Sequence, residues 1–259
     1  SLTYYALINC LMIRAKNQQM KSPRSNWQKD FKEAIVWIDG CFEKCPTSTT
    51  DPLTPKLWTL RGICCLCCGQ IVAAKQSLHK AWDEMDHIEA GVNLAECYMR
   101  EKDFKKAINI LEKLYGIKEV VVTNMAMDIP DLQRLVLRKL GICWSNVYEQ
   151  KKNPGDLQRA EKFYREFLQL KPGDIFAMDA LMRILNNTGR FDEAAFLACK
   201  LINIHPKYPN AWYNFGCYET MNKRYATGKV YFEECLKRNK KHIEARHNLD
   251  QILQGGLAV

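Results

Sequence analysis

Residues 174–206 read DIFAMDALMRILNNTGRFDEAAFLACKLINIHP, and residues 209–240 read PNAWYNFGCYETMNKRYATGKVYFEECLKRNK. Pro172 and Pro206, each at the end of a stretch of this kind, lie 34 residues apart. When the two stretches are superimposed with this period, each position of one stretch pairs with a position of the other. The matched pairs are Gly189 with Lys223, Ala194 with Gly228, Ala198 with Phe232, and Leu201 with Cys235. A constant period of this length is typical of a helical repeat array.

The matched positions suit a repeat made of two antiparallel α-helices. A Gly or Ala on the first helix lets the second helix approach closely, and large residues fill the gap between neighbouring pairs. Proline at the end of the repeat stops the second helix, because it cannot continue the hydrogen-bond ladder. The pattern therefore predicts an all-α chain of stacked helical pairs.

Five residues of the second stretch, Trp212, Phe215, Gly216, Phe232 and Cys235, resemble the tetratricopeptide pattern W-x2-L-G…A-x3-F-x2-A…P. The upstream residues that follow the same offsets are Ala34, Ile38, Cys41, Pro46, Trp58, Gly62, Gly69, Ala74, Leu78, Ala81, Leu94, Ala95, Tyr98, Ala107, Leu111, Leu114, Leu140, Gly141, Trp144, Ala160, Tyr164 and Phe167. The resemblance implies a right-handed α-solenoid of about six such helical pairs. We predict a single domain, residues 1–259, with pairs at about 1–46, 54–86, 87–120, 129–172, 174–206 and 208–240 and a capping helix at 241–253.

Four stretches depart from the repeat. Enlarged connections within pairs are expected at residues 17–28 and 150–157, and breaks between pairs are expected at residues 47–54 and 117–130. In repeat arrays such insertions lie in loops on one face.

Composition agrees with a helical array and argues against other classes. Apolar residues make up 47% of the 259 residues and charged residues 26%, values that favour a packed core over disorder. The 13 glycines and 9 prolines are too few for a β-rich fold of this length. No stretch reaches 18 consecutive apolar residues, so we expect no membrane span. The net charge of +9 mildly favours acidic partners.

The chain begins at Ser1 and lacks the pattern of a signal peptide, so we expect a processed product or a fragment. The 12 cysteines lie mostly within amphipathic helical patterns, where they act as small apolar residues. We therefore expect free thiols in a reducing compartment, the cytoplasm by preference, with the nucleus and the cilium left open.

Cys64, Cys65, Cys67 and Cys68 form two overlapping C-x-x-C spacings. A zinc site needs four ligands that converge in tetrahedral geometry, and no second cysteine or histidine pair nearby completes such a set. We interpret the cluster as packing residues around Gly62, with a metal or redox role left open.

No catalytic motif is present. The five histidines are scattered without metal-ligand spacing, and neither a nucleophile elbow nor a phosphate-binding loop occurs. We predict that the chain is not an enzyme, has no catalytic residue, and needs no cofactor, metal or small-molecule substrate.

In superhelices of this family the first helix of each pair lines the inner groove, where ligand peptides lie. Candidate groove residues at exposed positions of these helices, and on the capping helix, are Arg138, Lys139, Asp179, Arg183, Asn186, Asn210, Tyr213, Asn214, Cys217 and His247. Asparagine donates and accepts hydrogen bonds and so can hold peptide main chain, and arginine can pair with a carboxylate.

Some chaperone cochaperones of the family clamp an acidic C-terminal tail with a Lys/Asn/Asn/Lys/Arg set. In this chain Asp179 stands where the set has Lys, and Arg183 stands where it has Asn, although Asn214 matches. The set is therefore broken, and we predict that the chain does not act as this clamp.

The leading hypothesis is a protein-binding scaffold that holds a partner's peptide or helix in the groove within a larger assembly. The alternative is an RNA-binding repeat module, because residues 222–247 contain eight Lys or Arg against three Glu. No RNA-stacking motif interleaves aromatic residues with these charges, so nucleic acid is the less favoured partner. An enzyme that uses the cysteine cluster is the third hypothesis.

Overall fold

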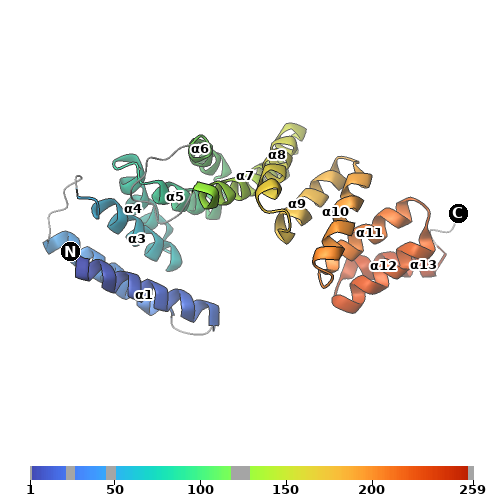
Figure 1. Ribbon diagram of the computed structural model, residues 1–259, viewed down its shortest axis with the longest axis horizontal. Coiled ribbons are helices and arrows are strands. Elements are labelled where there is room, and N and C mark those ends of the chain that lie inside the picture. The colour runs from blue at the N-terminus through green and yellow to red at the C-terminus, as the bar shows by residue number, and fades with distance from the viewer. Residues whose placement is uncertain (1, 22–26, 45–50, 118–128, 256–259) are drawn as a thin grey trace. The chain divides into compact units, whose positions relative to one another are not determined.

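The computed structural model describes residues 2–21, 27–44, 51–117 and 129–255. These residues form thirteen α-helices and no β-strand (Figure 1). The chain divides into two compact units, Ser1–Gln150 and Lys151–Val259. The first contains α1 (Leu2–Lys21), α2 (Trp27–Lys44), α3 (Thr54–Cys67), α4 (Ile71–Asp83), α5 (Ile88–Arg100), α6 (Phe104–Tyr115) and α7 (Ile129–Lys151). The second contains α8 (Pro154–Leu170), α9 (Ile175–Asn187), α10 (Phe191–Ile204), α11 (Pro209–Met221), α12 (Tyr225–Arg238) and α13 (Ile243–Leu253).

The prediction of an all-α fold built from tetratricopeptide-like helical pairs is confirmed. The hand of the superhelix, the number of repeats and the organisation of the repeats as a single domain stay predictions. None of the described helices combines the length and the apolar character needed to cross a membrane.

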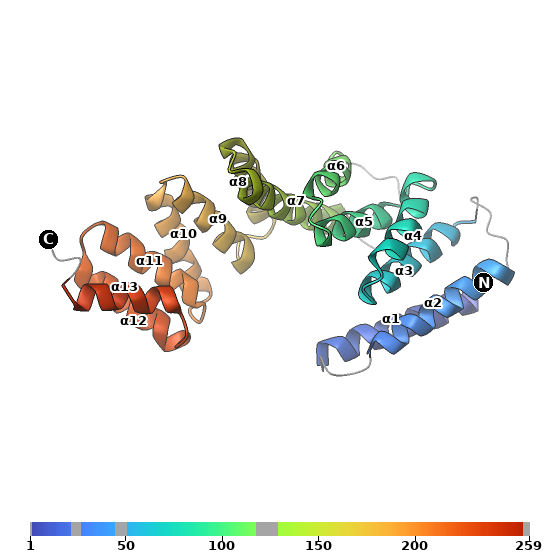
Figure 2. The same ribbon diagram turned by 180° about the vertical axis from the view of Figure 1, so that it is seen from behind.

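In the N-terminal unit, consecutive helices pack on each other from the pair α1 and α2 to the pair α5 and α6 (Figures 1 and 2). α3 also contacts α5, so the first helices of successive pairs are neighbours. Gly62 of α3 shows why the motif requires a small residue: a Cβ atom added there would lie 2.4 Å from the Cγ atom of Leu78 on α4. The two helices therefore pack as closely as their side chains allow.

The C-terminal unit repeats this arrangement, since each helix from α8 to α13 contacts the next. A Cβ atom added to Gly216 of α11 would lie 2.8 Å from the Cε1 atom of Phe232 on α12. A Cβ atom on Gly228 of α12 would lie 2.4 Å from the hydroxyl oxygen of Thr220 on α11. Small residues on both helices thus bring α11 and α12 together around the fully buried Phe232.

The turn between the two helices of a pair has the same backbone conformation in several repeats. Gly189 and Lys223, which the superposition matched, have φ angles of +73° and +59° and each lie two residues before the second helix. Gly69 and Lys102 occupy the equivalent places, with φ angles of +78° and +62°. Glycine adopts this left-handed conformation without strain, whereas the same conformation at lysine costs roughly 1 kcal/mol of conformational free energy.

Candidate functional site

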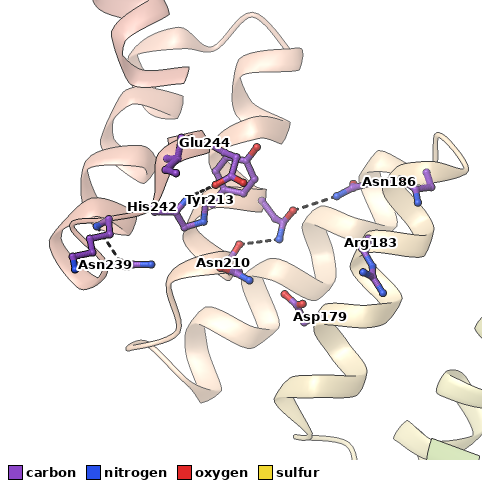
Figure 3. A pocket seen from close by; sticks show the side chains of 12 residues that line it. Asp179, Arg183, Asn186, Asn210, Tyr213, Asn239, His242 and Glu244 are labelled. Carbon is purple, nitrogen blue, oxygen red and sulfur yellow. Dashed lines mark hydrogen bonds and ion pairs between the residues drawn. The ribbon is translucent and has the colours of Figure 1, made fainter. Parts of the chain in front are cut away.

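A cavity of about 600 Å³ lies on the C-terminal unit, where α9, α11 and the start of α13 meet (Figure 3). Most of the residues that line it are polar or charged. The lining residues are Asp179, Arg183, Asn186, Asn187, Asn210, Tyr213, Asn214, Asn239, Lys241, His242, Ile243 and Glu244. Six of the candidate groove residues lie together here: Asp179, Arg183, Asn186, Asn210, Tyr213 and Asn214. We call this cavity the α9–α11–α13 groove.

A row of hydrogen-bonded amides crosses the groove (Figure 3). The Nδ2 atom of Asn186 donates to the Oδ1 atom of Asn214 at 3.3 Å, and the Nδ2 atom of Asn214 donates to the backbone carbonyl of Asn210 at 2.8 Å. The Nδ2 atom of Asn210 in turn donates to the hydroxyl of Tyr208 at 3.2 Å. These bonds fix the orientation of the amides and leave part of their hydrogen-bonding capacity for a ligand.

The two acidic side chains of the groove are Asp179 and Glu244. Burial, followed by the neighbouring charge of Asp179, raises the pKa of Tyr208. The Oε2 atom of Glu244 lies 3.2 Å from the Nδ1 atom of His242.

The two cationic side chains of the groove are both exposed. Arg183 is exposed on α9, and Lys241 is exposed in the turn before α13. Within the described ranges, the guanidinium of Arg183 and the ammonium of Lys241 form no ion pair and no side-chain hydrogen bond. The groove therefore offers a ligand two cations that have no ion-pair partner, beside the carboxylates of Asp179 and Glu244.

Aromatic packing fixes the end of the groove near α13. The Nδ1 atom of His242 accepts a hydrogen bond from the backbone N–H of Ala245 at 3.2 Å and so caps α13. The ring of Tyr213 lies 4.8 Å from the imidazole of His242, measured between centroids, and 6.0 Å from the ring of Phe232. Burial is the main cause that raises the pKa of Tyr213, which therefore presents a neutral hydroxyl.

Four of the candidate residues do not line this groove. His247 lies exposed on α13, where its Nε2 atom is 3.1 Å from the Nε2 atom of Gln251. Arg138 and Lys139 belong to α7 in the N-terminal unit. Lys139 forms an ion pair with Glu96 of α5, and only 13% of its side chain is exposed. Cys217 of α11 is half-buried, and its Sγ atom lies 3.6 Å from the Nδ2 atom of Asn248.

The ion pair of Glu96 predicts a pH dependence of stability. Burial alone would raise the pKa of Glu96, but Lys139 and Arg100 outweigh burial and hold this pKa below its usual value. The unfolded chain therefore binds the proton more readily. The stabilisation is fully present above the unfolded-state pKa of about 4.3, and it is lost as pH falls through the lower folded-state pKa.

We expect Glu96→Gln to lower the free energy of unfolding at pH 7 by about 1–2 kcal/mol, between the values for surface and buried pairs. Urea unfolding at pH 7 and pH 3.5 measures the difference, which should shrink at the lower pH. Glu112→Gln, at an exposed site on α6, is the control. A loss that stays the same at both pH values would contradict the role of this ion pair.

The groove residues that the sequence did not predict are Asn187, Asn239, Lys241, His242, Ile243 and Glu244. The repeat period could have predicted two of these residues. His242 and Glu244 stand 34 residues after Tyr208 and Asn210, so extending the period by one repeat would have found them.

The cysteine cluster lies at the end of α3. Cys64 and Cys65 are buried, and Cys67 and Cys68 are half-buried. Burial raises the pKa of all four thiols, which favours the neutral form that packs in a core. The described part of the chain contains no group of three or more His, Cys, Asp or Glu placed to hold a metal ion. Elsewhere, Cys10 and Cys199 are exposed, so the expectation that they act as small apolar packing residues is wrong.

Intramolecular ion pairs occupy part of the basic C-terminal segment. Arg224 forms two hydrogen bonds with the carboxylate of Glu219, at 2.6 and 2.7 Å. Arg238 pairs with Glu234, and its guanidinium lies 3.9 Å from the ring centroid of Trp212. These cations are therefore less free to bind phosphate than the sequence suggested, and the RNA-binding alternative gains no support.

Comparison with known proteins agrees with this geometry. Residues 69–114 match the family model for the tetratricopeptide repeat, and no curated protein sequence matches the chain. Among solved structures, YrrB, described as a TPR protein with an unusual peptide-binding site, is similar with a TM-score of 0.60 at 16% identity, covering 81% of this chain and 96% of that chain. MamA from Desulfovibrio magneticus RS-1 is similar with a TM-score of 0.59 at 12% identity, covering 76% of this chain and 99% of that one.

A further MamA structure has a TM-score of 0.58 at 16% identity, with 76% of this chain and 98% of that chain covered. At these identities the likeness shows the fold alone. The family match shows a tetratricopeptide repeat at residues 69–114, and the solved structures show that the chain shares the fold of tetratricopeptide repeat proteins.

Proposed function

We propose that this chain is a non-catalytic interaction scaffold that holds an extended segment of a partner protein in the α9–α11–α13 groove, as part of a larger assembly. The observation that carries the proposal is the hydrogen-bonded row formed by Asn186, Asn214 and Asn210. An extended peptide has unpaired main-chain N–H and C=O groups, which such amides can bind. A helical ligand satisfies these groups internally and would make little use of the row.

The similarity to YrrB gives this proposal further support, since a peptide-binding site is described for that protein. The groove also fits the requirement of a peptide site that its polar groups be held in place before the ligand arrives. The residues that bear the proposal lie within a single compact unit.

The test compares partner proteins captured by the wild-type chain and by a variant with Arg183→Glu and Asn214→Ala, identified by quantitative mass spectrometry. We expect the double variant to lose most of the groove-bound partners, by about tenfold or more in recovery, because a charged hydrogen bond and a main-chain contact are both removed. Circular dichroism should show unchanged helix content. The matched control is Lys105→Glu with Asn109→Ala, two exposed positions on α6. If the groove variant retains every partner that the control retains, the contacts lie elsewhere.

A further inference from the structure

A carboxylate, an imidazole and a phenol are hydrogen-bonded in series on the N-terminal unit, outside the groove. His79 and Asp83 stand four residues apart on α4, and the Nδ1 atom of His79 lies 2.6 Å from the Oδ2 atom of Asp83. The Nε2 atom of His79 lies 2.9 Å from the hydroxyl oxygen of Tyr98 on α5. We call Asp83, His79 and Tyr98 the α4–α5 triad.

The chemistry of the three groups determines where the protons of the triad lie. An ionised carboxylate only accepts hydrogen bonds, so the Nδ1 atom of a neutral His79 carries the hydrogen and donates it to Asp83. The Nε2 atom then presents its lone pair, and the hydroxyl of Tyr98 donates to it. A nucleophile within roughly 2.6–3.2 Å of a base, with a third group that orients the base, is the arrangement of an activated nucleophile. Both distances of the triad fall in this range.

Two lysines hold the ring of Tyr98 in place. The Nζ atoms of Lys75 on α4 and Lys106 on α6 each lie 5.4 Å from the centroid of this ring, the distance of a cation–π contact. Each lysine also pairs with a carboxylate, Lys75 with Glu101 at 2.6 Å and Lys106 with Asp103 at 3.2 Å. The lysines therefore position the ring, while their charges are balanced by their own partners.

We propose that Tyr98 is a covalent acyl-acceptor site, in which His79 is the general base and Asp83 is a positioning residue. The phenol oxygen attacks the carbonyl carbon of a thioester or an aryl ester, and the phenol proton passes to the Nε2 atom of His79. The bond from the carbonyl carbon to the leaving group then breaks, and His79 returns the proton to the leaving group or to water. The product is an acyl ester of Tyr98, formed once per chain.

The surroundings of the triad favour an acyl donor over a phosphoryl donor. Phosphoryl transfer depends on cations that neutralise the phosphate oxygens, and both lysines near Tyr98 are already paired. Tyr98 is half-buried and 42% of the His79 side chain is exposed, so the triad borders on solvent. This inference does not rest on the proposed function, since the triad and the groove belong to different units.

The probe is p-nitrophenyl acetate, added to the whole chain at neutral pH, with acetylation of each tyrosine followed by peptide mass spectrometry. We expect Tyr98 to be acetylated about 100-fold faster than Tyr225, the low end of the rate gain from a general base. Tyr225 is a half-buried tyrosine of α12 and makes no side-chain hydrogen bond in the described part of the chain. It is therefore the internal reference within the same sample.

A variant of the base tests the role of His79. In His79→Ala we expect acetylation of Tyr98 to slow to about the rate of Tyr225, because the proton acceptor is gone. Free imidazole added to this variant should restore part of the rate, which would not happen if the substitution only disturbed packing. His247→Ala, at an exposed histidine of α13, is the matched control and should leave the rate unchanged.

A variant of the carboxylate tests the positioning role of Asp83. The amide of Asp83→Asn can donate to the Nδ1 atom of His79, which moves the hydrogen to Nε2 and removes the acceptor that faces Tyr98. We expect acetylation of Tyr98 to slow by tenfold or more. Nuclear magnetic resonance of the imidazole nitrogens should show the hydrogen on Nδ1 in the wild type and on Nε2 in the variant. A rate that falls while the tautomer stays the same would overturn the positioning role.

Two further results decide the proposal as a whole. Equal acetylation rates at Tyr98 and Tyr225 would overturn the acyl-acceptor site. A fast rate at Tyr98 that persists in His79→Ala would overturn the general base. Either result leaves the scaffold groove untouched, because the capture experiment on Arg183 and Asn214 tests that groove separately.

Discussion

Replacing Phe232 with alanine is expected to lower the free energy of unfolding by about 3–5 kcal/mol, the range for removing a buried aromatic ring. Phe232 of α12 is fully buried and fills the space that Gly216 leaves open on α11. It also forms a core cluster with Cys235 and Ala245, so the ring connects the last helical pair to α13. Its loss leaves a cavity that touches three helices at once.

Urea unfolding, monitored by circular dichroism, measures this loss of unfolding free energy. If the slope of the unfolding free energy against urea concentration is unchanged, the variant and the wild type unfold in the same transition. The matched control is Phe196→Ala on α10, where 72% of the side chain is exposed. We expect the control to change stability by less than about 0.5 kcal/mol. Equal losses at the two positions would mean that Phe232 does not serve as a core residue. Hydrogen exchange should localise the effect of Phe232→Ala to α11, α12 and α13, since a repeat contacts only its neighbours.

The fold could be predicted because its signals are local in the sequence. The offset between Gly216 and Phe232 encodes the contact of two helices that follow each other along the chain. The match of Gly189 with Lys223 is equally local, and the two residues share a left-handed backbone. A pattern of this kind depends only on residues that are near each other in the sequence. The fold can therefore be predicted without knowledge of distant contacts.

The groove could be predicted only in part, because its properties depend on partners from other helices. Lys139 occupies an exposed position on a helical wheel, but Glu96 of α5 engages it in an ion pair. The sequence likewise does not reveal that the charge of Asp179 acts on Tyr208, whose pKa it helps to raise. Rotamers and the register of neighbouring helices decide which side chain an acidic group contacts. The repeat period contains no information about either of them.

Replacing Gly62 with alanine tests whether close helix contact or helix propensity decides stability at the motif glycine. Alanine is the better helix former by about 1 kcal/mol, so propensity alone predicts a more stable protein. The added Cβ atom, however, would lie 2.4 Å from the Cγ atom and 2.7 Å from the Cδ2 atom of the fully buried Leu78. Overpacking of this kind costs about 1–3 kcal/mol. We therefore expect a net loss of stability, measured by urea unfolding.

Gly40→Ala is the matched control, because a Cβ atom at Gly40 of α2 would meet nothing within 4 Å. We expect this control to gain up to about 1 kcal/mol, the opposite sign from Gly62→Ala. A second variant, Leu78→Ala, removes the side chain that the new methyl group would strike. In that background Gly62→Ala should no longer destabilise, because the methyl group enters the cavity that Leu78 leaves, and the two changes should be strongly non-additive. If the effects simply add, the glycine is not required by the contact with Leu78, and the physical reading of the motif is wrong for this pair.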